Sequence, residues 1–312
     1  MHAFVNVALP VFAIILAGYL AGRAGVLGGE SSRALNGFVY YVALPALIFI
    51  SMARVPVAAV FDWAFIGAFF GAQVLTFALA VAVARFVFPG SFAELSLHGI
   101  ASVFSNTGYM GLPLMLIAFG EAGALPGIIS TVINGSVNIG IGIALIELDR
   151  SRSQGLARIL ADVGTGVAKS PLVLAMVAGL LVSWADIVMP EPLARFCELL
   201  GAAAPPAALF AIGLFLVGQS VTRGIAEVSW LTFLKLIVNP LIAWVLATHV
   251  FEMDAVWTAA TVILSATPVG STLFVLAQRY DVYVQRTAGV ILLSTVFSVL
   301  TVSAVMVHYV SG

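Results

Sequence analysis

The feature that most constrains this chain is a series of ten long apolar stretches separated by mostly short polar connections. A membrane-spanning helix needs roughly 20 apolar residues to cross the hydrocarbon core. The 312 residues are 62% hydrophobic and only 9% charged, too few charges for a surface solvated by water. We therefore expect an all-α membrane protein with ten transmembrane helices. The expected spans are 3–22, 34–53, 62–85, 93–119, 125–147, 170–188, 193–218, 228–250, 255–278 and 285–309.

Basic residues orient these spans, because cytoplasmic loops of membrane proteins are enriched in Lys and Arg. With the N-terminus outside, the inside loops carry ten such residues and the outside loops carry two, Arg54 and Arg195. Lys235 lies within the eighth span. We therefore expect both termini outside and the linker 148–169 in the cytoplasm. The first apolar run lacks a positively charged start, which favours a first helix over a cleaved signal peptide.

Prolines indicate an internal repeat. Pro10 and Pro45 are 35 residues apart in the first two spans, and Pro171 and Pro206 are also 35 apart in the sixth and seventh. The second proline of each pair opens a similar string, PALIF and PAALF. Because five helices are an odd number, the two halves must have inverted topology. The alternative is that prolines, common in membrane helices, coincide by chance. The expected units are 1–147, the linker 148–169, and 170–312.

Two spans are interrupted at matching places in the two halves. The fourth contains SNTGYMGLP (105–113) and the ninth contains SATPVGST (265–272). Proline and glycine weaken a helix, and a break at membrane depth is tolerated only inside protein or beside a water-filled cavity. The N-terminal end of a half-helix attracts anions and the C-terminal end attracts cations. Broken helices 4 and 9 that cross therefore predict a secondary transporter with a site for a small anion near the midplane.

Asn106 is the leading candidate for a substrate contact, because its amide can both donate and accept hydrogen bonds. The alternative is that Asn106 only caps the broken helix. The other expected substrate-binding residues in the two interrupted spans are Ser105, Thr107, Gly108, Thr267, Pro268, Gly270, Ser271 and Thr272. The expected helix breaks are Gly111, Pro113 and Pro268.

Four polar residues in other spans each have two interpretations. Asn134 and Asn138 lie one turn apart on the fifth span, where they either contact the substrate or hold helices together. Gln73 in the third span either coordinates a cation or packs in the same way. Lys235 either carries a charge needed for transport or extends its long side chain to the membrane interface.

Composition and spacing argue against several other classes of chemistry. A net charge of −1 gives no basic surface for nucleic acid. Cys197 is the only cysteine and the four histidines match no metal-site spacing, so we expect no metal and no cofactor. Every Asp and Glu falls in a loop or near a helix end, so we expect no carboxylate-based proton coupling. Uncoupled flux and a sodium ion bound by hydroxyl, amide and carbonyl oxygens both stay open.

Two rival classes lack their signatures in the sequence. An intramembrane enzyme would need a pair of mid-membrane aspartates, a Ser–His pair or a zinc motif, and neither HExxH nor GxSxG occurs. A channel would need a pore lining or a filter repeat, and neither is visible. We therefore expect a carrier and not an enzyme.

Four strings occur in order at fitting helices: LNGFVYYVALPALIF (35–49), SNTGYMGLPL (105–114), KLIVNPL (235–241) and ATPVGSTLFVLAQRYDV (266–282). Together they resemble the auxin efflux carrier family, which includes plant PIN-type auxin carriers and bacterial malonate-type permeases. The resemblance covers essentially the whole chain.

The resemblance implies two inverted five-helix repeats, as in bile-acid sodium symporters and sodium–proton antiporters. Helices 1, 2, 6 and 7 would form a scaffold. Helices 3–5 and 8–10 would form a transport domain that moves like an elevator and binds substrate near Asn106 and Pro268. Members often form homodimers through the scaffold. The implied substrate is a small organic anion such as a mono- or dicarboxylate, and the implied location is a bacterial inner membrane.

The chain departs from the plant members of this family in two places. Ser105 stands where plant members have proline, and the linker 148–169 is short. Both differences favour a microbial metabolite over auxin as the substrate.

The distribution of basic residues makes a prediction about topology. A fluorescent protein inserted in 148–169 should fluoresce and alkaline phosphatase inserted there should be inactive, because both report a cytoplasmic location. The same two fusions in the loop between the sixth and seventh spans serve as the control and should give the reverse pattern. Phosphatase activity in 148–169 would invert the whole topology.

Overall fold

The computed structural model describes residues 9–57, 61–150, 164–165, 168–219 and 224–310. These residues form helices and connecting turns without a strand, and Ser105 and Val269 make one isolated antiparallel bridge. Helix occupies most of every range in which the sequence predicts a span. Within these described ranges, six helices are long and apolar enough to cross a membrane, and four more are apolar but shorter. The count of ten crossings and the inverted arrangement of the halves stay predictions.

The helices are numbered along the chain, with η marking π-helical turns. The first half contains α1 (Leu9–Arg23), α2 (Gly29–Phe38), η2 (Val39–Ala43), α3 (Leu44–Ala53), α5 (Trp63–Val87), α6 (Phe92–Ala101), η3 (Thr107–Gly111), α7 (Leu112–Phe119), α8 (Glu121–Val132), η4 (Ile133–Asn138) and α9 (Ile139–Arg150). The second half contains α11 (Pro171–Trp184), α12 (Glu191–Leu216), α13 (Ile225–Phe233), η5 (Leu234–Val238), α14 (Asn239–Val245), η6 (Leu246–Val250), α15 (Ala255–Ala266), α16 (Thr272–Tyr280) and α17 (Val284–Val310).

Three of the π-helical turns precede a proline. Pro45, Pro113 and Pro240 each occupy the second position of the α-helix that follows η2, η3 and η5. Proline has no N–H for the carbonyl four residues earlier, and its ring crowds that carbonyl. A π turn bonds each N–H to the carbonyl five residues earlier, so it lets the helix pass the proline without ending.

This local geometry corrects the expected position of one interruption. Gly111 lies in η3 and Pro113 lies in α7, so both belong to one continuous helical run, Thr107–Phe119. The non-helical residues are 102–106, which precede both of them. Pro268, the third expected break, lies between α15 and α16.

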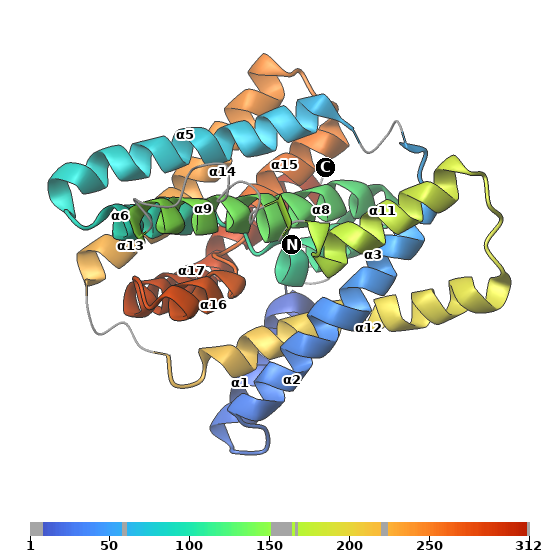
Figure 1. The fold of residues 1–312 in the computed structure, drawn as a ribbon, viewed down its shortest axis with the longest axis horizontal. Helices are drawn as coiled ribbons and strands as arrows, with labels where there is room; N and C mark the ends of the chain where they lie inside the picture. Colours follow the sequence, from blue (N-terminus) through green and yellow to red (C-terminus); the bar gives the residue numbers. More distant parts are fainter. Residues whose placement is uncertain (1–8, 58–60, 151–163, 166–167, 220–223, 311–312) are drawn as a thin grey trace.

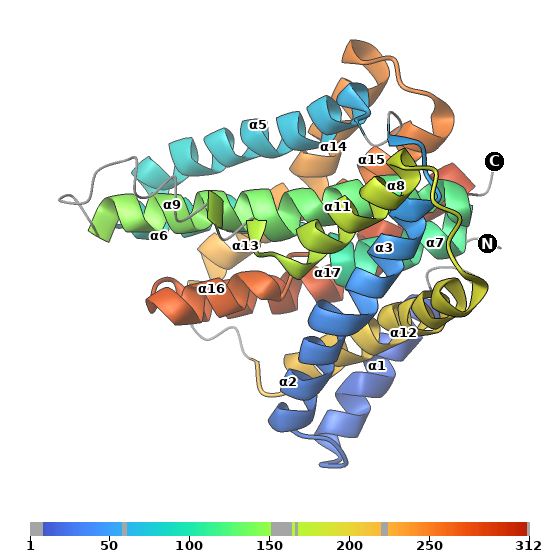
Figure 2. The ribbon, with the colours of Figure 1, turned by 45° about the vertical axis from the view of Figure 1, so that its right-hand side comes forward.

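The helices pack in two spatial groups, and neither group is one continuous part of the sequence. In Figure 1, α1, α2, α3, α11 and α12 lie together at the lower right, with α12 packed against α1 and α3 and with α11 packed against α3. The other group contains α5–α9 and α13–α17, which cross one another in the rest of the view. Figure 2 separates the same two groups. Each group therefore combines helices from both halves of the chain.

Close approach of backbones holds the first group together. A Cβ atom on Gly213 of α12 would collide with the carbonyl oxygen of Ile15, and one on Gly18 of α1 would collide with that of Phe210. Small residues at helix contacts allow this spacing, which suits association in lipid, where apolar burial gives no driving force.

A buried polar cluster ties together α6, α13 and the start of α17. The His98 Nδ1 atom lies 2.8 Å from Oε1 of Glu227 and 3.0 Å from the hydroxyl of Tyr283. The Tyr283 hydroxyl donates to the same carboxylate oxygen, and Nε of Arg286 lies 2.9 Å from the other oxygen. Glu227 is only 6% exposed. Its charge is thus compensated by Arg286 and by hydrogen bonds, as a buried carboxylate requires.

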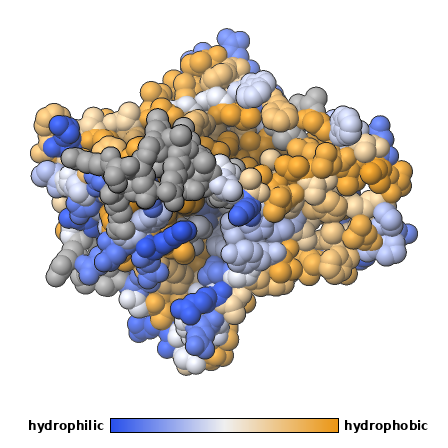
Figure 3. Space-filling model, viewed as in Figure 1, coloured by the Kyte–Doolittle hydropathy of each residue, from blue (hydrophilic) through white to orange (hydrophobic). Residues whose placement is uncertain are grey.

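Much of the exposed surface is apolar. Figure 3 shows hydrophobic side chains over much of the face in view, above all in its upper and right parts, while hydrophilic residues are most frequent in its lower and left parts. Large side chains such as Trp63, Phe86, Trp184 and Leu300 are more exposed than buried. Contiguous exposed apolar surface of this extent suits lipid as the solvent.

Candidate functional site

The site is built where two non-helical segments cross. One segment joins α6 to η3 and the other joins α15 to α16. The Asn106 N–H donates to the carbonyl of Pro268 at 2.8 Å, and the Gly270 N–H donates to the carbonyl of Phe104 at 3.1 Å. Between these two bonds, Ser105 and Val269 form the antiparallel bridge. Each segment thus satisfies backbone groups that the other leaves free at the interruption.

A side chain from each half supports its own segment. The Ser105 N–H donates to Oδ1 of Asn134 in η4 at 3.2 Å. The Val269 N–H donates to Oγ of Ser294 in α17 at 3.0 Å. Because Ser105 and Val269 are bridge partners, these two bonds are equivalent contacts on opposite sides of the crossing. Asn134 and Ser294 therefore hold the two segments in register.

Asn134 also anchors a network of amides. Its Oδ1 accepts from Nδ2 of Asn138 at 3.0 Å and from Nε2 of Gln73 at 3.4 Å, while Asn138 donates to Oε1 of Gln73 at 3.0 Å. Its Nδ2 donates to the carbonyl of Ser130 at 3.1 Å and lies 3.5 Å from the Thr107 hydroxyl. Gln73 and Asn138 are thus occupied by other protein groups, which favours packing over direct contact for these two residues.

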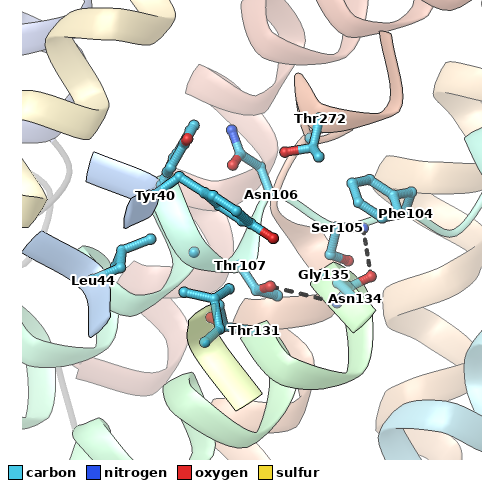
Figure 4. Close-up of a pocket in the computed structure, with 14 residues that line it drawn as sticks. Tyr40, Leu44, Phe104, Ser105, Asn106, Thr107, Thr131, Asn134, Gly135 and Thr272 are labelled. Carbon is cyan, nitrogen blue, oxygen red and sulfur yellow. Dashed lines mark hydrogen bonds between the residues drawn. The ribbon is translucent and has the colours of Figure 1, made fainter. Parts of the chain in front are cut away.

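A small cavity of about 40 Å³ lies beside the crossing, between the two helix groups. Figure 4 shows Tyr40 and Leu44 on one side of it and the segment from Phe104 to Thr107 on the other. No lining side chain carries a formal charge. The lining residues are Tyr40, Leu44, Phe104, Ser105, Asn106, Thr107, Gly108, Tyr109, Thr131, Asn134, Gly135, Leu172, Gly270 and Thr272.

The amide of Asn106 is free to bind a ligand. Asn106 is 6% exposed and immediately precedes η3, yet its side chain makes no capping hydrogen bond. It also has no hydrogen bond to any other side chain or carbonyl in the described residues. In Figure 4 the amide points away from Asn134, on the Thr272 side of the cavity. This geometry disfavours the interpretation of Asn106 as a cap alone.

Two helix N-termini meet at this cavity. The run Thr107–Phe119 begins with Thr107, Gly108 and Tyr109, and α16 begins with Thr272; all four line the cavity. The first N–H groups of a helix have no carbonyl one turn earlier within it, and they carry partial positive charge. The cavity therefore offers backbone donors to an anion without using a charged side chain.

The predicted residues separate into those that line the cavity and those that do not. Thr267 is buried with its hydroxyl on the Leu264 carbonyl at 2.8 Å, so it completes the end of α15. Pro268 contributes its carbonyl to the crossing but does not line the cavity, and neither does Ser271. Seven predicted residues line it: Ser105, Asn106, Thr107, Gly108, Asn134, Gly270 and Thr272.

The sequence did not predict the lining residues that come from the group of helices around α3 and α11. Tyr40 and Leu44 come from the second expected span and Leu172 comes from the sixth. Tyr40 lies in one of the strings that carry the family resemblance, which was the only sequence signal available for it. Apolar residues of this kind look like ordinary lipid-facing or core positions until the packing of the two groups is known.

Lys235 lies away from the cavity lining and does not reach the interface. It is fully buried in η5, and its Nζ donates to the carbonyl of Ser265 at 2.5 Å. Of the two interpretations made from the sequence, the extended side chain at the membrane interface does not fit this position.

Comparison with known proteins assigns the chain to a family. The family described as "Membrane transport protein" matches residues 3–306. The chain belongs to this family, the auxin efflux carriers. Together with the six long apolar helices, membership makes it an integral, multi-pass membrane protein.

Individual members of the membrane transport protein family match over nearly their whole length. A Rhizobium meliloti protein named "Putative malonate transporter" is 31% identical over 312 residues, covering 100% of this chain and 98% of the relative. The Escherichia coli K12 protein named "Uncharacterized transporter YfdV" is 25% identical, covering 96% and 95%. An "Uncharacterized transporter" of Methanothermobacter thermautotrophicus is 26% identical, covering 94% of each chain. All three are named as transporters.

The amide network predicts unequal effects of two similar substitutions. Asn134→Ala should lower the free energy of unfolding by about 1–3 kcal/mol, because it leaves the buried Ser105 N–H without its acceptor. Asn138→Ala is the matched control and should cost less, since the Asn134–Ser105 bond remains. Thermal unfolding in detergent measures both. Equal losses of stability in the two variants would show that the hydrogen bond from Ser105 to Asn134 contributes no more than the other bonds of the network.

Proposed function

We propose that this protein is a secondary transporter that carries a small organic anion through the crossing of its two interrupted helices. The observation that carries the proposal is the free Asn106 amide beside two helix N-termini in one cavity. A carrier site needs groups that bind the substrate and can release it, and uncharged backbone donors meet both needs.

The cavity also favours a class of substrate. Its volume of about 40 Å³ leaves room for a few water-sized groups, which fits a mono- or dicarboxylate better than a bulky aromatic acid. An anion is favoured because both helix ends present N–H groups and partial positive charge. The name of the Rhizobium meliloti relative supports the same class, and malonate is the first dicarboxylate to test.

The mechanism that fits this arrangement is elevator-type alternating access. The group α1, α2, α3, α11 and α12 would be the scaffold, and the group α5–α9 with α13–α17 would be the transport domain. The cavity is lined by Tyr40, Leu44 and Leu172 from the first group and otherwise by the second. A sliding movement of one group along the other would therefore carry the bound anion past a fixed wall.

The two halves, 1–147 and 170–312, would be inverted five-helix repeats joined by the linker 148–169. Broken helix 4 would comprise α6, η3 and α7, and broken helix 9 would comprise α15 and α16. The equivalent hydrogen bonds that the bridge partners donate to Asn134 and Ser294 support such a relation. The basic residues support both termini outside, and the family resemblance supports a bacterial inner membrane and a homodimer formed through the scaffold.

Asn106→Ala separates binding from folding. The wild-type protein in detergent should be stabilised by its substrate acid by mass action, about 2.7 kcal/mol at a concentration 100 times the dissociation constant. Asn106→Ala should lose this shift and the uptake of that acid into proteoliposomes. Its stability without ligand should stay within about 0.5 kcal/mol, because its side chain holds no other element.

Ser271→Ala is the matched control, since Ser271 lies on the opposite segment but outside the cavity lining. It should keep the ligand shift. A capping role for Asn106 would instead lower stability by about 1 kcal/mol while leaving the ligand shift in place, and that result would contradict the proposal.

A further inference from the structure

Most hydrogen-bond donors among the side chains that line the cavity already have an acceptor within the protein. Such donors are committed to holding the fold and are not available to a ligand unless a bond of the protein breaks. Five lining side chains donate in this way: Ser105 to the Val103 carbonyl at 3.5 Å, Thr107 to that of Ser130 at 3.3 Å, Tyr109 to that of Asn36 at 3.5 Å, Thr131 to that of Gly127 at 2.7 Å, and Asn134 to that of Ser130 at 3.1 Å.

Three lining side chains keep a free donor. The amide of Asn106 and the hydroxyls of Tyr40 and Thr272 have no hydrogen-bond partner among the described residues, although all three border the cavity. A polar group beside a cavity that lacks a partner in the protein is available to water or to a ligand. These three side chains, together with the helix N–H groups, are therefore the donors that a bound anion can use.

The free donors lie on two facing walls. Asn106 belongs to the crossing and Thr272 begins α16, so both accompany the helix N-termini. Tyr40 comes from η2, in the other group of helices. Figure 4 shows Tyr40 and Leu44 on helices at the left of the cavity and Thr272 at its right. Leu44 and Leu172, the other lining residues from the group of Tyr40, are apolar, so the Tyr40 hydroxyl is the polar side-chain group on that wall.

This arrangement suits an anion with an acceptor at each end. A carboxylate at the crossing can accept from Asn106, from Thr272 and from the backbone N–H groups of two helix starts. A monocarboxylate held there presents only carbon to the opposite wall. A short dicarboxylate presents a second carboxylate to that wall, and this charge loses water on binding, so it needs a donor there. The cavity of about 40 Å³ keeps the two walls close enough for a short acid alone.

We propose that the Tyr40 hydroxyl donates to the second carboxylate of a short dicarboxylate whose first carboxylate lies at the crossing, and that Tyr40 thereby makes the site prefer dicarboxylates to monocarboxylates. The inference rests on the function proposed above and names its substrate class. A hydrogen bond from a neutral donor to a charged group changes an affinity by about 10- to 100-fold. One hydroxyl is thus enough to set the preference.

The test uses malonate and acetate, because malonate is acetate with a second carboxylate on its methyl carbon. Dissociation constants come from titrating the melting temperature of the protein in detergent at neutral pH, where both acids are ionised. The wild-type protein should bind malonate more tightly than acetate. Tyr40→Phe, which removes the hydroxyl and keeps the ring, should weaken malonate by about 10- to 100-fold and leave acetate within about twofold.

Tyr41→Phe is the matched control. Tyr41 is the next residue, and its ring centroid lies 5.0 Å from that of Tyr40, yet Tyr41 is 68% exposed and does not line the cavity. This variant should bind both acids as the wild-type protein does. Both variants should melt at the wild-type temperature without ligand, because the Tyr40 hydroxyl holds no described residue and Tyr41 is exposed.

The outcomes separate this inference from the proposed function. Equal weakening of malonate and acetate in Tyr40→Phe would show that Tyr40 only shapes the cavity, and unchanged malonate binding would show that its hydroxyl does not touch the acid. Either result overturns the inference and leaves an anion carrier in place. A wild-type protein that binds neither acid would contradict the proposed substrate class and this inference together.

Discussion

The rest of the structure depends on the antiparallel pairing of two short non-helical segments. In a bilayer, backbone groups that are not bonded within a helix must find partners in the protein. Residues 102–106 and 267–271 find some of these partners in each other, through the Asn106–Pro268 and Phe104–Gly270 hydrogen bonds. This pairing brings a helix N-terminus from each half to one small cavity. The side chains of Asn134 and Ser294 hold that pairing in place by accepting hydrogen bonds from its backbone.

Charged side chains lie outside the cavity lining at this crossing. The cavity itself has no charged lining side chain, so the proposed anion would be held by amide and hydroxyl donors and would leave without breaking an ion pair. Lys235 is buried in η5 outside the cavity lining, and its Nζ donates to the Ser265 carbonyl near the C-terminal end of α15. The buried carboxylate of Glu227 lies in a separate cluster, where Arg286 and Tyr283 compensate it. Positive potential at the cavity thus comes from the two helix N-termini, which are fixed and require no solvent reorganisation when an anion binds.

Periodicity and composition predicted the helices well, because lipid imposes a strict minimum length on every span. The crossing residues Asn106 and Gly270 could also be predicted, since Gly, Pro and Asn interrupt helices by known chemistry. The position of the first break could not be predicted. Pro113 was expected to cause it, but the π turn η3 lets the helix continue past that proline. The non-helical residues lie earlier in the chain, before η3 begins. Tyr40 and Leu172 could not be predicted either, because their role depends on how two groups of helices pack. Nor does sequence alone distinguish a lysine that extends to the interface from one that is bound at a helix end, as Lys235 is.

Binding of the substrate at the crossing would be visible in a structure determined by electron cryomicroscopy with a saturating stabilising acid. Malonate is the first choice of acid. We expect ligand density bounded by Asn106, Thr107 and Thr272, with a carboxylate toward the two helix N-termini. Two other cavities are bordered by arginines, Arg54 and Arg286. Ligand density in either of these cavities, with the crossing empty, would show that the substrate does not bind at the crossing.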